Sequence, residues 1–116
     1  MVATGFGYEA DRRAAQAELL TKLLPNVRDI RRIGAAALDL CRVAEGTVDA
    51  YFEHGINAWD FAAGAIIARE AGAVVRHPGF DKGSADGELT WAAGADLAPA
   101  FEKLLAAHRA TDALRG

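Results

Sequence analysis

The sequence has few of the residues that define several classes of protein. Its single cysteine, Cys41, excludes an internal disulfide bond and a zinc site built from cysteines. Cys41 lies in an apolar stretch of an expected helix, so we predict a buried structural thiol. The 13 Lys and Arg residues are outnumbered by 16 Asp and Glu residues, and the net charge of -3 gives no electrostatic case for binding nucleic acid.

Long apolar runs are also missing. No segment reaches the roughly 18 uninterrupted apolar residues that a membrane-spanning helix needs. The first residues do not combine a basic region with an apolar run, as a secretory signal would. These absences predict that the protein has no membrane partner and, by default, a cytoplasmic location.

The segments that are present alternate between strand and helix patterns. A length of 116 residues with 52% apolar residues predicts a single domain over residues 1–116 with a real core. Strands are expected at 2–6, 27–33 (or an extended link), 47–53, 73–76 and 89–93, and helices at 11–24, 34–44, 61–72 and 96–109. Residues 77–87 are expected to form a loop and residues 110–116 a frayed tail. This order predicts an α/β fold with a mixed, mostly parallel sheet and helices on its faces.

The most informative stretch joins the strand at 47–53 to the helix at 61–72. Glu53 ends the strand and Asp60 opens the helix. In open α/β sheets ligands bind beyond the carboxyl ends of strands, so two acids there are suited to a cation or a polyol. Asp60 has a carboxylate of the kind that magnesium prefers, but its spacing from Asn57 also fits a helix capping box. Glu53 could accept a hydrogen bond from a sugar-like hydroxyl, although the residues alone favour a solvated strand end.

The first part of the helix expected at 61–72, residues 61–68, is apolar on every face. A helix without a polar face is usually buried on several sides, so we predict that it lies between layers with its N-terminus aimed at a site. Trp59, just before it, is interpreted as a packing anchor beside that site.

Two other stretches have both a functional and a structural interpretation. Gly34, Ala35 and Ala36 open a helix without a capping side chain, so their N–H groups could receive a hydroxyl or an anion, although tight packing alone explains small residues there. The arginine-rich segment 28–32 could bind an anion, but a solvated edge with ion pairs is the favoured interpretation.

Several stretches, in order, resemble the inositol monophosphatase family. They are ATGF at 3–6, IGAAALDL at 33–40, DAYFE at 49–53, WDFAAGA at 59–65 and EAG at 70–72. The resemblance extends from Ala3 to the last helix and covers only the C-terminal part of a family member, under half of a full enzyme. It implies the C-terminal half of the family's layered α/β sandwich.

The resemblance also implies roles for particular residues. Asp60 matches the aspartate that binds a catalytic magnesium ion and lies near the inositol, and Glu53 matches a glutamate that contacts a substrate hydroxyl. Gly34, Ala35 and Ala36 match the helix start that lines the substrate pocket, although many members have serine or threonine where this chain has Ala35. The implied substrate is a small phosphate ester, inositol monophosphate, with fructose 1,6-bisphosphate or histidinol phosphate as alternatives.

The family's remaining machinery has no counterpart in this sequence. The resemblance implies metal-assisted attack of water on phosphorus, but the N-terminal glutamate and the Asp-Pro-x-Asp-Gly-Thr motif that hold the metals are absent. We therefore hypothesise the C-terminal domain of a magnesium-dependent phosphomonoesterase, with no catalytic residue of its own and inactive alone. Its expected partner is the missing N-terminal half or a second copy. The alternative is a non-catalytic, truncated module that acts by self-association or by binding a partner.

Overall fold

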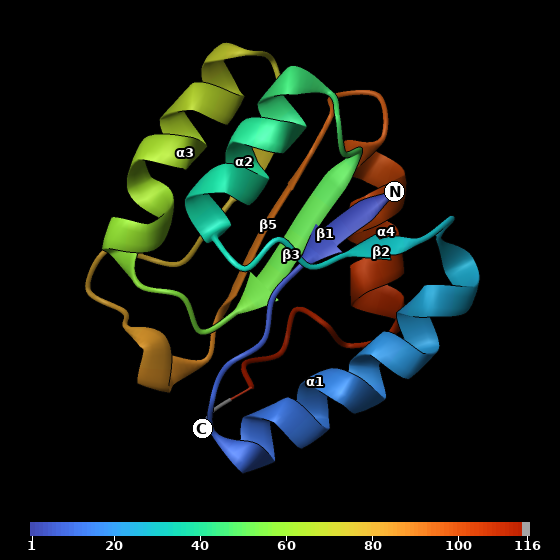
Figure 1. The fold of residues 1–116 in the computed structure, drawn as a ribbon, viewed down its shortest axis with the longest axis vertical. Coiled ribbons are helices and arrows are strands. Elements are labelled where there is room, and N and C mark those ends of the chain that lie inside the picture. The colour runs from blue at the N-terminus through green and yellow to red at the C-terminus, as the bar shows by residue number, and fades with distance from the viewer. Residues whose placement is uncertain (115–116) are drawn as a thin grey trace.

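The computed structural model describes residues 1–114 and contains five strands and four α-helices (Figure 1). The strands are β1 (Val2–Thr4), β2 (Ile30–Arg31), β3 (Ala50–His54), β4 (Val74–Arg76) and β5 (Leu89–Ala93). The helices are α1 (Ala10–Leu23), α2 (Ala36–Glu45), α3 (Ala58–Glu70) and α4 (Ala98–Ala107), with short 3-10 turns at Leu24–Asn26 and Ser84–Asp86. The order of elements is the predicted one, and the ambiguous segment at 27–33 contains a short strand.

The strands form one sheet in the order β2-β1-β3-β5-β4. Strand β1 pairs in parallel with both β2 and β3, whereas β5 is antiparallel to both β3 and β4. All strands except β5 therefore run in the same direction, which confirms the mixed, mostly parallel sheet.

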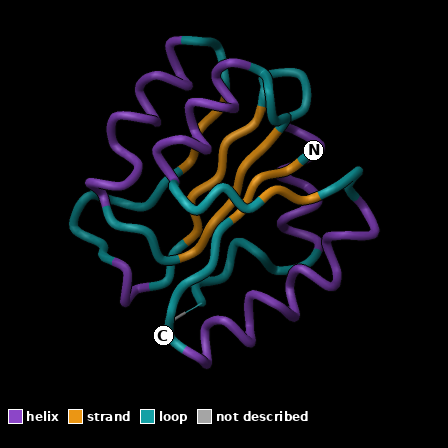
Figure 2. Tube along the Cα trace, in the orientation of Figure 1, coloured by secondary structure: helices purple, strands orange, loops and turns teal. Residues whose placement is uncertain are grey.

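Helices cover both faces of the sheet, α2 and α3 on one and α1 and α4 on the other (Figures 1 and 2). Alternation along β3 produces the two cores, because Tyr51 faces α2 and α3 while Ala50 and Phe52 face α1 and α4. Helices α2 and α3 also pack tightly on each other. A Cβ atom at Gly64 of α3 would lie 2.8 Å from Cβ of Leu40 in α2, so only glycine permits this approach.

The burial predicted for α3 on several sides is wrong for this chain. Its buried residues lie on one side, where α2 and the sheet are its neighbours. On the other side Ile66 is 61% exposed and Ile67 is 48% exposed. No described element covers that side, although its residues are apolar enough to be buried.

Other differences concern the ends of elements and single side chains. Helix α1 begins at Ala10, one residue before the predicted start, with Glu9 at its N-cap, and α4 begins after Leu97 rather than at Asp96. Cys41 is only partly buried, in contrast to the prediction of a buried thiol. None of the helices in the described part of the chain has the length and apolar character required to cross a membrane.

The tail predicted to fray from residue 110 packs against the body of the protein as far as Leu114. Ala110 is 1% exposed. Its carbonyl accepts a hydrogen bond of 2.6 Å from Nε2 of His54. The N–H of Leu114 donates to the carbonyl of Gly87 at 2.8 Å. The rest of the predicted tail, residues 115–116, lies outside the described residues.

Candidate functional site

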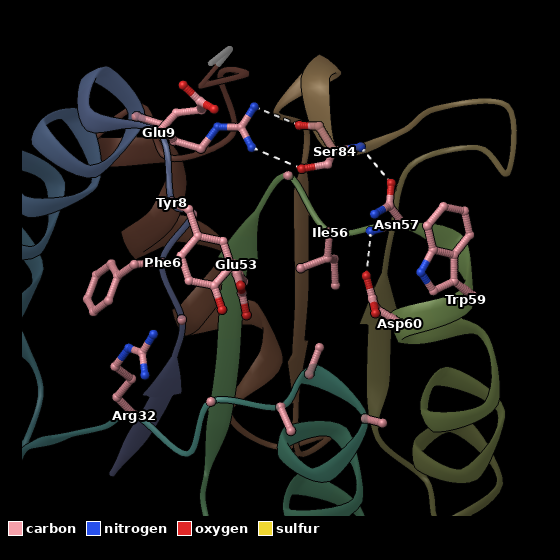
Figure 3. Close-up of a pocket in the computed structure, with 18 residues that line it drawn as sticks. Phe6, Tyr8, Glu9, Arg32, Glu53, Ile56, Asn57, Trp59, Asp60 and Ser84 are labelled. Atoms are coloured by element: carbon pink, nitrogen blue, oxygen red, sulfur yellow. Dashed lines mark hydrogen bonds between the residues drawn. The ribbon is translucent and has the colours of Figure 1, made fainter.

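A pocket of about 630 Å³ lies beyond the carboxyl ends of β1 and β3, where α2 and α3 begin (Figure 3). Its walls come from the segment after β1, from α1, from the turns that precede α2 and α3, and from the loop between β4 and β5. All the residues assigned to a site from the sequence line this one pocket, namely Gly34, Ala35, Ala36, Glu53 and Asp60.

Asp60 occupies the third position of α3, and its carboxylate points back toward the start of the helix. Its Oδ2 atom accepts a hydrogen bond of 3.0 Å from the backbone N–H of Asn57. This bond satisfies one of the exposed N–H groups at the helix start. One oxygen of Asp60 therefore forms the helix cap that the spacing from Asn57 predicted. Within the described part of the chain, only Oδ2 of this carboxylate accepts a hydrogen bond. The other oxygen therefore stays available to a ligand in the pocket.

Glu53 reaches the pocket from the end of β3, on the same face of the strand as Tyr51. Its Oε1 atom accepts a hydrogen bond of 2.8 Å from the hydroxyl of the fully buried Tyr51. Burial raises the pKa of the Glu53 carboxyl, while the Tyr51 hydroxyl and the Arg32 guanidinium oppose that rise. A side chain on Gly5 would overlap this carboxylate. Glu53 is therefore a partly buried hydrogen-bond acceptor that Tyr51 fixes in place, and not the solvated strand end that the residues alone favoured.

The start of α2 presents backbone donors to the pocket. Gly34 has a φ of 90°, which favours glycine, and it turns the chain into the helix. Ala35 occupies the N-cap position and makes no side-chain capping bond, so the first N–H groups of α2 have no cap. Since Ala35 and Ala36 line the pocket, these N–H groups are suited to a hydroxyl or an anion.

Asp39, which sequence reasoning did not single out, is fully buried behind this helix start. Neither of its carboxylate oxygens has a hydrogen-bond partner among the described residues. Burial and the neighbouring Glu53 raise the pKa of Asp39 to about 7, against an opposing effect of Arg32. The signal in the sequence was a charged residue inside the apolar stretch ALDLC.

Two arginines and an aromatic rim complete the pocket. Arg32 lines it and lies 5.7 Å from the ring of Phe6, so one member of the arginine-rich segment faces the site. Arg12, also missed from the sequence, is buried and donates to the carbonyl of Ser84 at 2.6 Å. Trp59 stands at the rim and is 82% exposed, so its interpretation as a packing anchor is wrong for this chain.

The carboxylates supply only part of a metal site. Residues 1–114 contain no group of three or more His, Cys, Asp or Glu side chains arranged to hold a metal ion. Magnesium takes oxygen ligands in a near-octahedral shell and is usually held by one or two carboxylates together with waters and phosphate oxygens. The free oxygen of Asp60 suits one position in such a shell, and the rest of the shell must come from elsewhere.

Comparison with known proteins assigns the chain to a family. Residues 1–113 match the inositol monophosphatase family. The chain is 63% identical over 78 residues to an inositol-1-monophosphatase of Mycobacterium leprae, covering 67% of this chain and 27% of that relative. It is 49% identical over 76 residues to the Nus factor SuhB of Pasteurella multocida, covering 65% of this chain and 28% of that protein.

A solved structure extends the match over almost the whole fold. The structure of Mycobacterium tuberculosis SuhB superposes with a TM-score of 0.83 at 47% identity, covering 96% of this chain and 42% of that one. The chain therefore spans well under half the length of the relatives that it matches. Because the family match nevertheless covers residues 1–113, the chain belongs to the inositol monophosphatase family.

Proposed function

We propose that this chain is the C-terminal portion of a magnesium-dependent phosphomonoesterase that hydrolyses inositol monophosphate. The observation that carries the proposal is the meeting of three features in one pocket. These are the free oxygen of Asp60, the held carboxylate of Glu53 and the uncapped start of α2. A cyclic polyol phosphate offers a matching set of hydroxyls and an anionic group.

In this proposal each group has a separate task. Asp60 provides one oxygen to magnesium, which when bound supplies Lewis-acid stabilisation of charge at phosphorus. Glu53 accepts a hydrogen bond from a ring hydroxyl, and its bond from Tyr51 fixes the carboxylate before the substrate arrives. The N–H groups at the start of α2 donate to another ring oxygen. Such positioning lowers the barrier because orientation is already set in the bound state.

The same proposal makes the isolated chain inactive or nearly so. One free carboxylate does not complete a magnesium shell, and 58% of the solved relative lies outside the match. The missing ligands would come from the N-terminal half or from a second copy of the chain. Fructose 1,6-bisphosphate and histidinol phosphate are the alternative substrates, since they too combine hydroxyl groups with a phosphate ester.

The test measures phosphate release from inositol 1-phosphate, with and without magnesium. The samples are this chain alone and this chain mixed with the complementary N-terminal part of Mycobacterium tuberculosis SuhB. We expect release only in the mixture with magnesium, and a loss of at least about 100-fold with Asp60→Asn. Magnesium-dependent release by the chain alone would overturn the claim of an incomplete site. No release from any mixture that has been shown to associate would overturn the proposed activity.

A second function, a protein-binding module, is favoured by one observation. Ile66 and Ile67 expose apolar surface on α3, and exposed apolar patches mark interaction sites. Some relatives are named as Nus factors, which suggests a protein partner in place of a substrate. Sedimentation of the wild type and of an Ile66→Glu, Ile67→Glu double variant distinguishes the cases. Self-association that disappears in the variant, together with an inactive mixture, would favour the module.

A further inference from the structure

A continuous run of hydrogen bonds crosses the pocket wall and ends on the carboxylate of Asp60 (Figure 3). The guanidinium of Arg12 donates to the carbonyl of Ser84 at 2.6 Å. The N–H of Ser84 donates to Oδ1 of Asn57 at 2.8 Å, and the N–H of Asn57 donates to Oδ2 of Asp60 at 3.0 Å. The run joins helix α1, the loop between β4 and β5, and the start of α3, which are far apart in the sequence.

The first link is anchored by a buried charge. Arg12 is only 4% exposed, and no carboxylate within residues 1–114 forms an ion pair with it. A buried guanidinium needs hydrogen-bond acceptors, so the Ser84 carbonyl is held firmly. The guanidinium lies against Gly55, where a Cβ atom would overlap it. The turn before α3 therefore accommodates Arg12 only because glycine occupies that position.

The second link is also fixed from two sides. Ser84 opens the 3-10 turn Ser84–Asp86, and Oδ2 of Asp86 accepts the N–H of Gly83 at 2.8 Å. That cap sets the direction of the Ser84 N–H, which points at the side chain of Asn57. Asn57 consequently touches both neighbours, the loop through its side-chain oxygen and Asp60 through its backbone N–H.

We propose that Arg12, Ser84 and Asn57 form a positioning relay that fixes the orientation of the Asp60 carboxylate. The relay holds one oxygen, Oδ2, against the helix start and turns the other toward the pocket. That this relay positions a magnesium ligand rests on the proposed function. That it couples the loop to Asp60 rests only on the hydrogen bonds described above. The three residues act through Asp60 and touch no reacting atom, so they are positioning residues.

The chain offers a matched pair of variants at Ser84. Ser84→Pro deletes the N–H that bonds Asn57, and Ser84→Ala keeps it. Proline is favoured at the first position of a helical turn, and Gly83 has the extended conformation (φ of -124°, ψ of -176°) that a following proline requires. The two variants therefore differ mainly in the one bond under test.

The first readout is amide hydrogen exchange of this chain, followed by NMR without metal. Ser84→Pro should speed exchange of the Asn57 amide about three- to tenfold, whereas Ser84→Ala should change it less than about twofold. The amide of Phe52 in β3 serves as the internal control and should exchange equally in both. Equal exchange of the Asn57 amide in the two variants would overturn the relay.

A second pair at Asn57 carries the test if the proline variant does not fold. Asn57→Ala removes the acceptor and should free the Ser84 amide to exchange, while Asn57→Asp retains an acceptor and should restore protection. In the reconstituted phosphatase, Asn57→Ala should raise the half-saturating magnesium concentration at least about threefold, and Asn57→Asp should recover most of that loss. Identical magnesium dependence in both would overturn the positioning role.

The two proposals fail in different ways. If the proposed activity is wrong, wild-type mixtures show no magnesium-dependent release while the exchange differences at Asn57 persist. If the relay is wrong, wild-type mixtures are active and the exchange differences are absent. The exchange data thus test the relay independently of the activity.

Discussion

Replacing Asp39 by asparagine tests whether the fold keeps a proton on a buried carboxyl. Asp39 is fully buried in α2, neither oxygen has a partner among the described residues, and its pKa is raised to about 7. Asparagine has nearly the same shape but no charge. The substitution therefore removes the ionisation and keeps the packing.

The magnitude follows from the two states of the carboxyl group. In the unfolded chain its pKa is 3.8 and in the folded chain about 7, so between these pH values the folded state keeps a proton that the unfolded state releases. The free energy of unfolding of the wild type must then fall as pH rises from about 4 to about 7. At about 1.4 kcal/mol per pKa unit, the contribution of Asp39 reaches at most about 4 kcal/mol. Glu53, whose pKa is also raised, acts in the same direction, whereas His54, whose pKa is lowered by burial, acts in the opposite one.

Urea unfolding followed by tryptophan fluorescence measures this effect. Trp91 is 4% exposed and reports loss of the core, whereas Trp59 is 82% exposed and should change little. We expect the wild type to be clearly less stable at pH 8 than at pH 5, and Asp39→Asn to flatten most of that difference. Asp96→Asn, at an exposed position, is the control and should keep the wild-type profile.

One result would refute the reasoning, an Asp39→Asn profile that is parallel to the wild type between pH 5 and pH 7. The comparison of the two profiles isolates Asp39 from His54, whose pKa is lowered by burial and whose effect on stability has the opposite sign. Parallel profiles would mean that the folded chain holds Asp39 ionised, with a donor that the described contacts do not supply.

Two glycine substitutions test close approaches and a third, Gly72→Ala, is their control, each measured as a shift in urea midpoint at constant slope. Gly72→Ala, at a φ of 93° with no atom within 4 Å of the new Cβ, should cost only the left-handed backbone penalty of about 1 kcal/mol. Gly55→Ala, at a φ of 78°, should cost at least about 2 kcal/mol, because Arg12 must also move; equal costs at the two positions would show that Arg12 does not pack there. Gly64→Ala should destabilise by about 1 kcal/mol or more, since the overlap with Leu40 exceeds the gain in helix propensity, and a more stable variant would contradict the α2–α3 packing.

Much of the fold was predictable because its signals are local. Alternation over residues 47–53 located β3, and the breakers in 77–87 located the long loop. The order of strands was not predictable, because β5 inserts between β3 and β4 and nothing in its local pattern specifies that pairing. The periodicity of a helix shows which of its faces are apolar but not which faces other elements cover. For this reason the exposure of Ile66 and Ile67 in α3 was not predicted.

The candidate site was likewise predictable only in part. Glu53 and Asp60 could be identified because they flank one short turn and match a family pattern, and the structure brings them to one pocket. Arg12 and Ser84 could not, since they are 72 positions apart in the chain and meet only in three dimensions. The segment that carries Arg12 showed no feature beyond an ordinary charged helix.

Helix α3 combines two features that the described chain leaves incomplete. Ile66 and Ile67 are exposed where a helix adapted to solvent carries polar side chains, and Asp60 has a free oxygen where magnesium needs several. A protein-binding module accounts for the first feature but gives no reason for a partly buried Glu53 bonded to Tyr51 beside Asp60. Additional polypeptide that covers α3 and contributes oxygen ligands would account for both. On this argument the phosphatase proposal explains more of the chain than the module does.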